Sequence, residues 1–268
     1  MKLKVLMDNH TYIDQYYLGE PALSFYLDNG KDRILFDTGY SDAFMNNARK
    51  MNIELKTVNK VVLSHGHNDH TGGLPNLLNL NKWLTVISHP DTFLYRQDDE
   101  GLAISSPLSR MQLEERCNLQ LSRESREVSE NLFYLGEIPQ YVDFEPRYRI
   151  GKIQIRGVMN DDFIFDDSAL AYRGKNGIFV ITGCSHAGIC NIIEHARRVL
   201  REEKIAGVIG GFHLFENDER LAKTIEYLKS CAIDQLYPCH CVSLKAKIEM
   251  GKQLDIGEVG VGMELDIE

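Results

Sequence analysis

The sequence has no long apolar run, no excess of positive charge and no dense cysteine framework. None of its 268 residues lies in a stretch that approaches the roughly 20 apolar residues of a membrane-spanning helix. The opening residues, MKLKVLMDNH, also lack an apolar run long enough for a secretory signal peptide. We therefore expect a protein that does not associate with membranes.

Positive charge is in deficit. The chain has 30 Lys and Arg residues against 39 Asp and Glu residues, which gives a formal net charge of −9. A protein that follows a nucleic-acid duplex normally needs a basic face, so this balance disfavours nucleic acid as the main partner. We expect a small-molecule substrate instead, because a local basic pocket is compatible with an acidic average. No feature of the sequence specifies an oligomeric state.

The cysteines are scattered and include no C-x-x-C pair. They are Cys117, Cys184, Cys190, Cys231, Cys239 and Cys241. This distribution is typical of proteins in a reducing compartment, where thiols stay available to a metal. We therefore expect a cytoplasmic protein.

Strand and helix signals alternate in the second half of the chain, whereas hairpin signals dominate the first half. Two apolar runs flank Asn29-Gly30 within residues 22–39, which predicts a hairpin with a two-residue turn. From residue 188 onward, helical patterns precede strand-like runs, as expected for helices packed on a sheet. Residues 91–150 are polar and irregular by comparison. We predict one α/β domain over residues 1–268, with residues 91–150 as a cap insertion.

His65, His67, Asp69 and His70 lie close together in the stretch SHGHNDHTGG. This stretch follows KVVLS, which predicts a short buried strand, so the four side chains lie on the loop at its carboxyl end. His65 and His67 are two positions apart and can face one metal ion. Asp69 and His70 can begin a second metal site. Imidazole and carboxylate ligands suit zinc, iron or manganese.

Three further histidines each follow a predicted strand. His186 follows GIFVITGCS, His213 follows AGVIGGF and His240 follows IDQLYPC. Because all three come just after strands, we expect them to lie at one edge of a sheet. The remaining histidines are interpreted as structural or solvated: His10, His89 and His195.

The cluster HGHNDH has the H-x-H-x-D-H form of the metallo-β-lactamase superfamily, and ILFDTG upstream resembles its first motif. The phrases LSFYLDNGKDRILFDTG, GEIPQYVDFE, VITGCSHAGI, GGFHL and YPCHC resemble a cytoplasmic branch of metal-dependent hydrolases. That branch includes the archaeal dihydropterin-methyl-ribofuranosylaminobenzene phosphate synthases. The resemblance implies an αββα metallo-β-lactamase sandwich with a dinuclear metal site at one edge.

The resemblance implies a ligand set residue by residue. His65 and His67 match ligands of the first metal, and Asp69 and His70 match ligands of the second. His240 matches the last histidine of the superfamily. Two divalent ions follow, with zinc favoured and iron or manganese as alternatives. A redox di-iron role is disfavoured, because those relatives usually carry glutamate where this chain keeps His67.

Cys184 occupies the position where many relatives carry an aspartate that bridges the metals. Either Cys184 is a thiolate ligand and His186 completes the first metal, or His186 is the ligand and Cys184 only lines the site. His213 either contacts substrate or metal, or hydrogen-bonds within a turn. Asp37 is expected to orient a histidine rather than to bind metal.

The chain departs from the branch at two motifs. Gln140 stands where an arginine is common, which leaves Arg147 and Arg149 as alternative anion contacts, and we expect Arg147 to contact substrate. HCVS replaces a threonine-glycine pair that often follows the last motif. An acidic run is interpreted either as solvated or as the source of a carboxylate near the metals: Asp161, Asp162, Asp166 and Asp167.

These residues favour a dinuclear metal-dependent hydrolase that acts on a small phosphorylated or anionic metabolite through a metal-bound hydroxide. Asp69 and His186 are the expected catalytic residues. A second hypothesis is a synthase or transferase of methanopterin-type pterin biosynthesis that uses a ribosyl phosphate. A third is a metal-binding protein without enzymatic activity.

Overall fold

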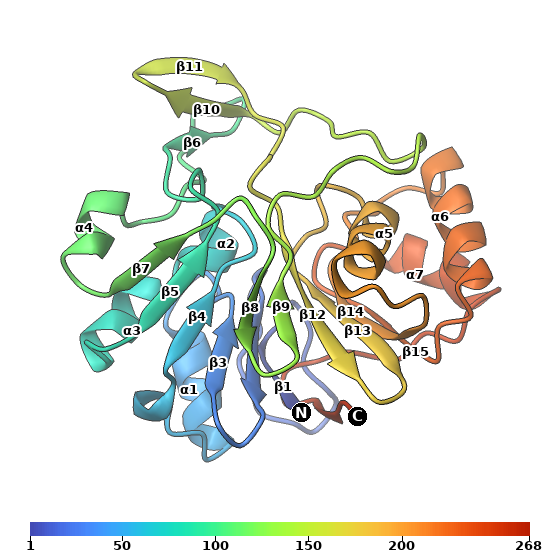
Figure 1. The fold of residues 1–268 in the computed structure, drawn as a ribbon, viewed down its shortest axis with the longest axis horizontal. Coiled ribbons are helices and arrows are strands. Elements are labelled where there is room, and N and C mark those ends of the chain that lie inside the picture. The colour runs from blue at the N-terminus through green and yellow to red at the C-terminus, as the bar shows by residue number, and fades with distance from the viewer. The chain divides into compact units, whose positions relative to one another are not determined.

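The computed structural model describes residues 1–268 and divides them into two compact units. The first unit comprises residues 1–123, 149–166 and 260–267, and the second comprises residues 124–148, 167–259 and 268. Each unit is built on its own β-sheet with helices packed on it (Figure 1). The units are described one at a time.

The sheet of the first unit has seven strands in the order β16-β1-β2-β3-β4-β5-β7. Strands β1, β2 and β3 pair in antiparallel fashion, and β3, β4, β5 and β7 run parallel to one another. The strands are β1 (Lys2–Met7), β2 (Ser24–Asp28), β3 (Arg33–Phe36), β4 (Lys60–Val62), β5 (Thr85–Ser88), β7 (Asn118–Leu121) and β16 (Glu264–Asp266).

Helices of the first unit cover its sheet through apolar side chains. Phe44 of α1 and Leu77 of α3 belong to one buried cluster with Val61 of β4 and Val86 of β5. Pro75 occupies the first turn of α3, where its missing N–H leaves no helix bond unmade. The helices are α1 (Ala43–Lys50), α2 (Asn68–Thr71), α3 (Leu74–Leu80), α4 (Arg110–Glu114) and the short 3₁₀ helix η1 (Leu55–Thr57).

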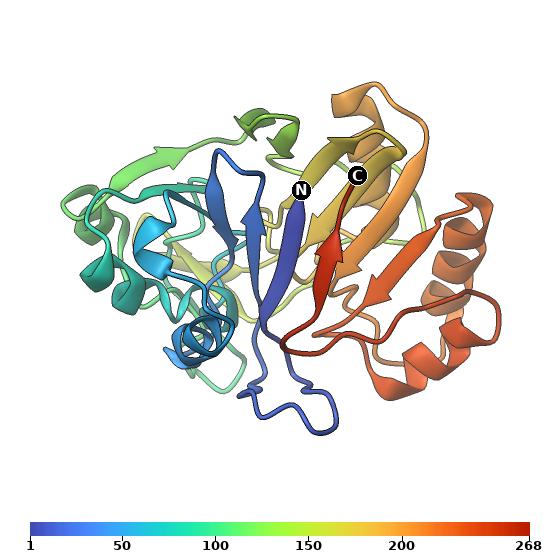
Figure 2. The same cartoon turned by 90° about the horizontal axis from the view of Figure 1, so that it is seen from below.

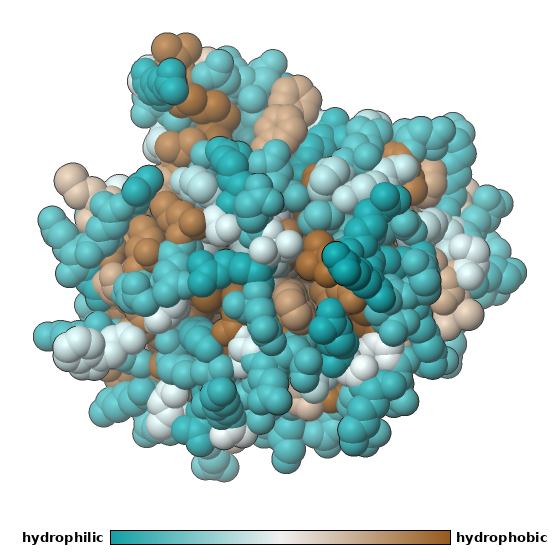
Figure 3. Space-filling model, viewed as in Figure 1, coloured by the Kyte–Doolittle hydropathy of each residue, from teal (hydrophilic) through white to brown (hydrophobic).

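A small three-stranded sheet completes the first unit. It consists of β6 (Arg96–Gln97), β10 (Lys152–Ile155) and β11 (Val158–Asp161). The β10–β11 hairpin exposes Ile155 and Val158, and an apolar patch is visible at its end (Figure 3).

The predicted hairpin at residues 22–39 is confirmed, but its turn is longer than expected. Asp28 pairs with Arg33, so four residues connect β2 to β3. The side-chain oxygen of Asn29 accepts hydrogen bonds from the backbone N–H groups of Lys31 and Asp32, at 3.1 and 2.8 Å. This Asn side chain closes the loop in the manner of an Asx turn, which a two-residue template does not anticipate.

The sheet of the second unit has six strands in the order β15-β14-β13-β12-β9-β8. Strands β13, β14 and β15 are parallel and are connected through α5 and α6, as the alternating pattern predicted. The strands are β8 (Arg126–Ser129), β9 (Leu132–Tyr134), β12 (Ala169–Gly174), β13 (Gly177–Thr182), β14 (Ile205–Gly210) and β15 (Gln235–Pro238).

Three helices pack on the second sheet: α5 (Ile189–Leu200), α6 (Glu219–Ser230) and α7 (Leu244–Gly251). Ile189, Ile193 and Leu200 follow helical spacing along α5, and all three enter a buried cluster with Val180 of β13 and Val208 of β14. This amphipathic packing fixes the loops at the carboxyl ends of the parallel strands.

Both chain ends reach the edge of the first sheet. Strand β16 pairs with β1 in antiparallel fashion, and the Met1 amino group donates a 2.6 Å hydrogen bond to the carbonyl oxygen of Ile267 (Figure 2). None of the helices combines the length and the apolar character that crossing a lipid bilayer would require.

Residues 91–150, the expected cap, contribute strands to both sheets. Strand β7 pairs with β5 in the first unit, and β9 pairs with β12 in the second. These strands are parts of the sheets, so the expected boundaries enclose more than a cap. The connecting loops of this range remain the candidates for a lid.

Candidate metal centre

His65 and His67 lie on the loop that follows β4, as the sequence predicted. Nε2 of His65 is 3.0 Å from Nδ1 of His67, and both side chains are buried. Two nitrogens bound to one tetrahedral zinc at 2.0–2.1 Å are separated by about 3.3 Å. The two imidazoles therefore present ligand atoms at a spacing that suits one metal ion.

Asp69 and His70 present a second pair of ligand atoms from α2. Oδ2 of Asp69 lies 3.5 Å from Nε2 of His70, and the His70 side chain is fully buried. The pair uses an oxygen and a nitrogen, which together suit zinc, iron or manganese. One loop and the helix after it thus carry two separate pairs of donors.

Asp37 orients His70, which confirms the expected contact between this aspartate and a histidine. Oδ2 of Asp37 is 2.7 Å from Nδ1 of His70, so Nε2 is the ring nitrogen left for a ligand role. Ser64 fixes the carboxylate in turn, because its backbone N–H and its hydroxyl donate to the two Asp37 oxygens at 2.8 and 2.7 Å. Ser64 Oγ also lies 3.0 Å from Nδ1 of His65. Sequence reasoning missed Ser64.

Burial and neighbouring charges shift the pKa values of His67 and His70 in opposite directions. Burial lowers the pKa of His67 to about 4. Burial also opposes protonation of His70, but the carboxylates of Asp69 and Asp37 outweigh it and raise its pKa well above the ordinary value. Without metal, His67 is therefore neutral at pH 7 and ready to bind a cation, whereas His70 must lose a proton first.

Gly72 and Gly73 provide close backbone approach rather than an unusual backbone conformation. A Cβ at Gly72 would lie 2.0 Å from the Tyr40 carbonyl oxygen, and one at Gly73 would lie 2.2 Å from that of Thr38. Both glycines have negative φ values. They therefore let α2 and α3 pack directly against the loop after β3.

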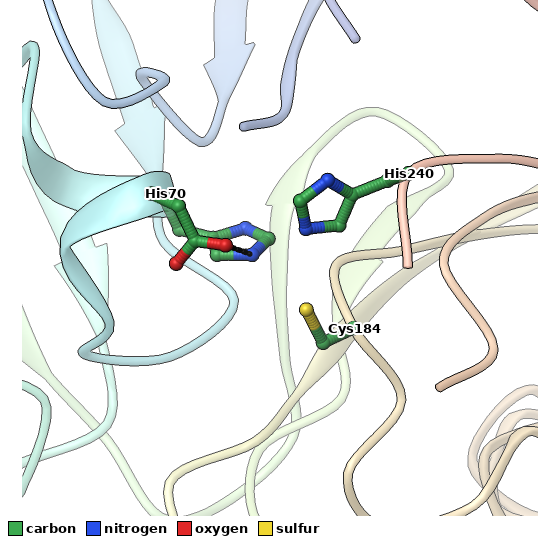
Figure 4. Close-up of side chains that lie close together, drawn as sticks. His70, Cys184 and His240 are labelled. Atoms are coloured by element: carbon green, nitrogen blue, oxygen red, sulfur yellow. Dashed lines mark ion pairs between the residues drawn. The ribbon is translucent and has the colours of Figure 1, made fainter. Parts of the chain in front are cut away.

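The second unit carries its candidate ligands on loops that follow parallel strands. Cys184 and His186 follow β13, and His240 follows β15. The Cys184 sulfur and a ring nitrogen of His240 lie within 4.8 Å of each other (Figure 4). Both atoms are donors that could hold a metal ion, and the role of Cys184 as a ligand stays a prediction.

His213 follows β14 and contacts His186. Their ring centroids are 4.4 Å apart, and the Tyr148 hydroxyl hydrogen-bonds Nδ1 of His213. The Tyr148 ring also lies beneath the guanidinium of Arg220, whose Cζ is 5.4 Å from the ring centroid. Burial raises the pKa of Tyr148, so its hydroxyl stays protonated at neutral pH. Tyr148 was not identified from the sequence, where it lies in an irregular stretch.

The two arginines that were predicted as alternative anion contacts, Arg147 and Arg149, belong to different units. Arg147 donates a 3.2 Å hydrogen bond to the carbonyl oxygen of Ile138 in the second unit. Arg149 forms an ion pair with Asp99 in the first unit, at 2.7 Å, and this pair is exposed. The exposed Gln140 donates to the Val142 carbonyl at 3.1 Å. Arg147 is thus the arginine that belongs to the same unit as His213.

The expectation that the acidic run is solvated is wrong for three of its four members. Asp162, Asp166 and Asp167 are buried, whereas Asp161 has a largely exposed side chain. Their partners, described below, are an arginine and backbone N–H groups. Sequence pattern alone did not reveal those partners, because they lie far away along the chain.

The histidines interpreted as structural or solvated have local partners or face solvent. His195 on α5 lies between the Tyr141 hydroxyl, at 2.8 Å from Nδ1, and the Leu135 carbonyl, at 3.0 Å from Nε2. Nδ1 of His89 accepts the backbone N–H of Asp91 at 3.1 Å, and His10 is exposed. The structure thus gives His89 and His195 partners within the fold, and the structural or solvated role of the three histidines stays a prediction.

Comparisons with known proteins agree with this architecture. The model of the metallo-β-lactamase superfamily matches residues 18–200. A 7,8-dihydropterin-6-methyl-4-(β-D-ribofuranosyl)-aminobenzene-5'-phosphate synthase of Methanocaldococcus jannaschii is 31% identical over 262 residues, which cover 92% of this chain and 89% of the relative. An uncharacterized protein of the same organism is 29% identical over 266 residues, covering 96% of this chain and 98% of that protein.

The solved structures include one that matches along the whole chain. The crystal structure of Tm1679, described as a metal-dependent hydrolase of the β-lactamase superfamily, superposes with a TM-score of 0.86 at 28% identity. The match covers 100% of this chain and 99% of Tm1679. The expected α/β fold class is therefore confirmed, and the chain belongs to the metallo-β-lactamase superfamily.

Proposed function

We propose that this protein is a dinuclear metal-dependent hydrolase that acts on a small phosphorylated or anionic metabolite. The observation that carries the proposal is the pair of donor sets on one loop and its helix. His65 and His67 have ligand atoms 3.0 Å apart, and Asp69 and His70 have ligand atoms 3.5 Å apart. Two metal positions, one at each pair, would use all four donors.

We assign the ligands of the second unit by their chemistry and by the family motif. By the family motif, His65, His67 and His186 would bind the first metal ion, and Asp69, His70, Cys184 and His240 would bind the second. Imidazole and thiolate donors favour zinc, with iron or manganese as alternatives. The six free cysteines fit a reducing cytoplasm.

Divalent cations in such a site lower the pKa of water and stabilise negative charge on a reacting oxygen. The chain contributes the positioning of the reactants. Asp69 has a partly exposed carboxylate, so one oxygen can bind metal while the other accepts a proton from the attacking water. His213 and Arg147 would contact the anionic group of the substrate. The protonated Tyr148 hydroxyl fixes the His213 ring that makes this contact.

Hydrolysis is tested with metal-reconstituted protein. Zinc, manganese and iron forms are assayed on p-nitrophenyl phosphate, bis-p-nitrophenyl phosphate and p-nitrophenyl acetate. We expect turnover of at least one phosphoester, loss of that turnover in Asp69→Ala, and retention in His195→Ala. An intact metal site without turnover on a broad panel would instead support a metal-binding protein without enzymatic activity.

A synthase of the pterin pathway is the second candidate, and the 31% identical relative from Methanocaldococcus jannaschii favours it. The test combines a 7,8-dihydropterin whose 6-methylene group carries a diphosphate leaving group with a ribofuranosylaminobenzene phosphate. Mass spectrometry follows the joined product, and a diphosphate assay follows the leaving group. Formation of that product, without phosphoester hydrolysis, would replace the hydrolase proposal. The replacement of the common arginine by Gln140 argues for a different substrate.

A further inference from the structure

Asp166 is a buried carboxylate that contacts the loop between the two metal-binding histidines of the first unit. Its Oδ2 accepts a 2.8 Å hydrogen bond from the backbone N–H of Gly66, which lies between His65 and His67. Its Oδ1 accepts a 2.6 Å hydrogen bond from Nη2 of Arg96. Both oxygens are therefore engaged, so Asp166 acts on the loop through the backbone.

The guanidinium of Arg96 holds the Asp166 carboxylate in place. Its side chain is fully buried, and its Nε donates to Asp162 Oδ2 at 2.8 Å. Nη1 of Arg96 also donates to the Thr92 carbonyl at 3.2 Å. A Cβ at Gly66 would lie 2.1 Å from Nη1 of Arg96, so the backbone of the loop packs in direct contact with the guanidinium. The position of the loop is thus set by a rigid, charged contact.

Asp167, the next residue, makes the equivalent contact in the second unit. Its Oδ2 accepts a 2.8 Å hydrogen bond from the backbone N–H of Ala187, which directly follows His186. The loop continues through Gly188 at φ 93°, and Glu145 then accepts hydrogen bonds from the N–H groups at the start of α5, at 2.9 Å from Cys190. The His186 loop is therefore also fixed through its backbone by a buried carboxylate.

We propose that Asp166 and Asp167 are positioning residues for one metal ion, the one assigned to His65, His67 and His186. The inference rests on the proposed ligand grouping. Each aspartate accepts a hydrogen bond from the backbone N–H of a residue adjacent to these ligands. The backbone that carries the three ligand rings is therefore held by the two carboxylates. Hydrogen bonds to a buried carboxylate are strong, because no water molecules compete to solvate the charge.

This role differs from general stabilisation of the fold. The Asp166 and Asp167 contacts adjoin the three ligands of the first metal. Among the ligands of the second metal, only Cys184 shares a loop with one of them. A purely structural carboxylate would weaken both metal positions together when removed, or neither. A positioning carboxylate should weaken the first metal selectively.

The experiment measures metal affinity in Asp166→Asn and Asp167→Ala. Asparagine cannot replace Asp166, because one amide group cannot accept from both Gly66 and Arg96. Asp161→Asn is the matched control, since that side chain is 59% exposed. Metal-free protein is titrated with zinc against a chromophoric chelator, and far-ultraviolet circular dichroism confirms that each variant is folded.

We expect one zinc equivalent to bind about 10–100-fold more weakly in each variant, as is typical when a residue that orients ligands is lost. The other equivalent and the control should match the parent. In cobalt-loaded variants, the thiolate band of the second metal should persist. Unchanged binding of both equivalents, or equal weakening of both, would overturn the proposal. Asp167→Ala keeps the test decisive if Asp166→Asn does not fold. A parent that binds no metal would refute the proposed function instead.

Discussion

Nδ1 of His70 lies 2.7 Å from Oδ2 of Asp37, and both side chains are fully buried. This contact leaves Nε2 of His70 for a ligand role beside Asp69. Asp69 and Asp37 together outweigh burial and raise the pKa of His70, so a cation must displace a proton from the metal-free protein. We therefore expect the affinity of the proposed second metal position to depend on Asp37, which does not itself bind the metal.

Replacing Asp37 by asparagine should weaken one of the two metal equivalents by about 10–100-fold. The amide removes the negative charge that supports His70 and disturbs the hydrogen bonds from Ser64. Zinc titration against a competing chelator measures the change. Asp28→Asn, at the end of β2, is the control and should bind as the parent does. Parent-like zinc affinity in Asp37→Asn would contradict the positioning role.

The fully loaded protein should contain about two transition-metal ions per chain, as expected for a dinuclear hydrolase site. His67→Ala and Asp69→Ala should each lower the metal content measured by mass spectrometry, because each variant loses a donor. His195→Ala should keep the parent's content, since that ring lies between Tyr141 and Leu135. Equal losses in all three variants would rule out the ligand assignment.

Cobalt substitution should reveal the Cys184 thiolate. A charge-transfer band in the near ultraviolet is expected in the parent and should vanish in Cys184→Ser, with weaker binding of the second metal. Cys184→Asp should restore binding and shift the preference toward harder ions such as manganese. If the parent binds two cobalt ions without this band, Cys184 is not a ligand.

Metal-free protein should be most stable near pH 6.5 as far as the ligand histidines are concerned. The pKa of His67 falls to about 4 on folding, so its contribution is present above pH 6.5 and is lost as the pH falls toward 4. That loss amounts to about 3 kcal/mol at most. The pKa of His70 is raised, so its contribution is present below pH 6.5 and is lost as the pH rises through its folded value.

Urea unfolding of chelator-treated protein across this pH range measures the loss of stability below pH 6.5, the acid limb, and the loss above it, the alkaline limb. His67→Gln should flatten the acid limb and leave the alkaline limb unchanged. An acid limb of the same depth in His67→Gln would show that another group causes it.

Local pattern predicted the elements whose residues carry a periodic or turn signal. Helical patterns are predicted from residue 188 onward, and α5 is observed at Ile189–Leu200, because its apolar spacing is regular and a glycine precedes it. The ligand loops were also predictable, since His65, His186 and His240 each follow a recognisable strand. Asp37 was recognised as the partner of a histidine from its place in the motif.

Long-range pairing explains what the sequence did not reveal. Strand β9 is short, and its pairing with β12 places Tyr134 opposite Leu170, far along the chain. The acidic run looked solvated because Arg96 lies 70 positions from Asp166. Tyr148 gave no signal, since its contact with His213 depends on how a loop without regular structure folds back.

Four residues at the ends of strands have left-handed backbone angles although none is glycine. These are Asp37 at φ 60°, Ser185 at φ 58°, His213 at φ 49° and His240 at φ 51°. Each such angle costs roughly 1–3 kcal/mol, which glycine would relieve.

Laboratory evolution that selects only for heat resistance would therefore favour glycine at these loops, at the expense of the proposed metal-dependent activity. Even Ser185 is a poor choice, because its hydroxyl donates a 2.6 Å hydrogen bond to Gly211. The exposed Ala232, at φ 48° just after α6, offers the same relief at no expense to the loops.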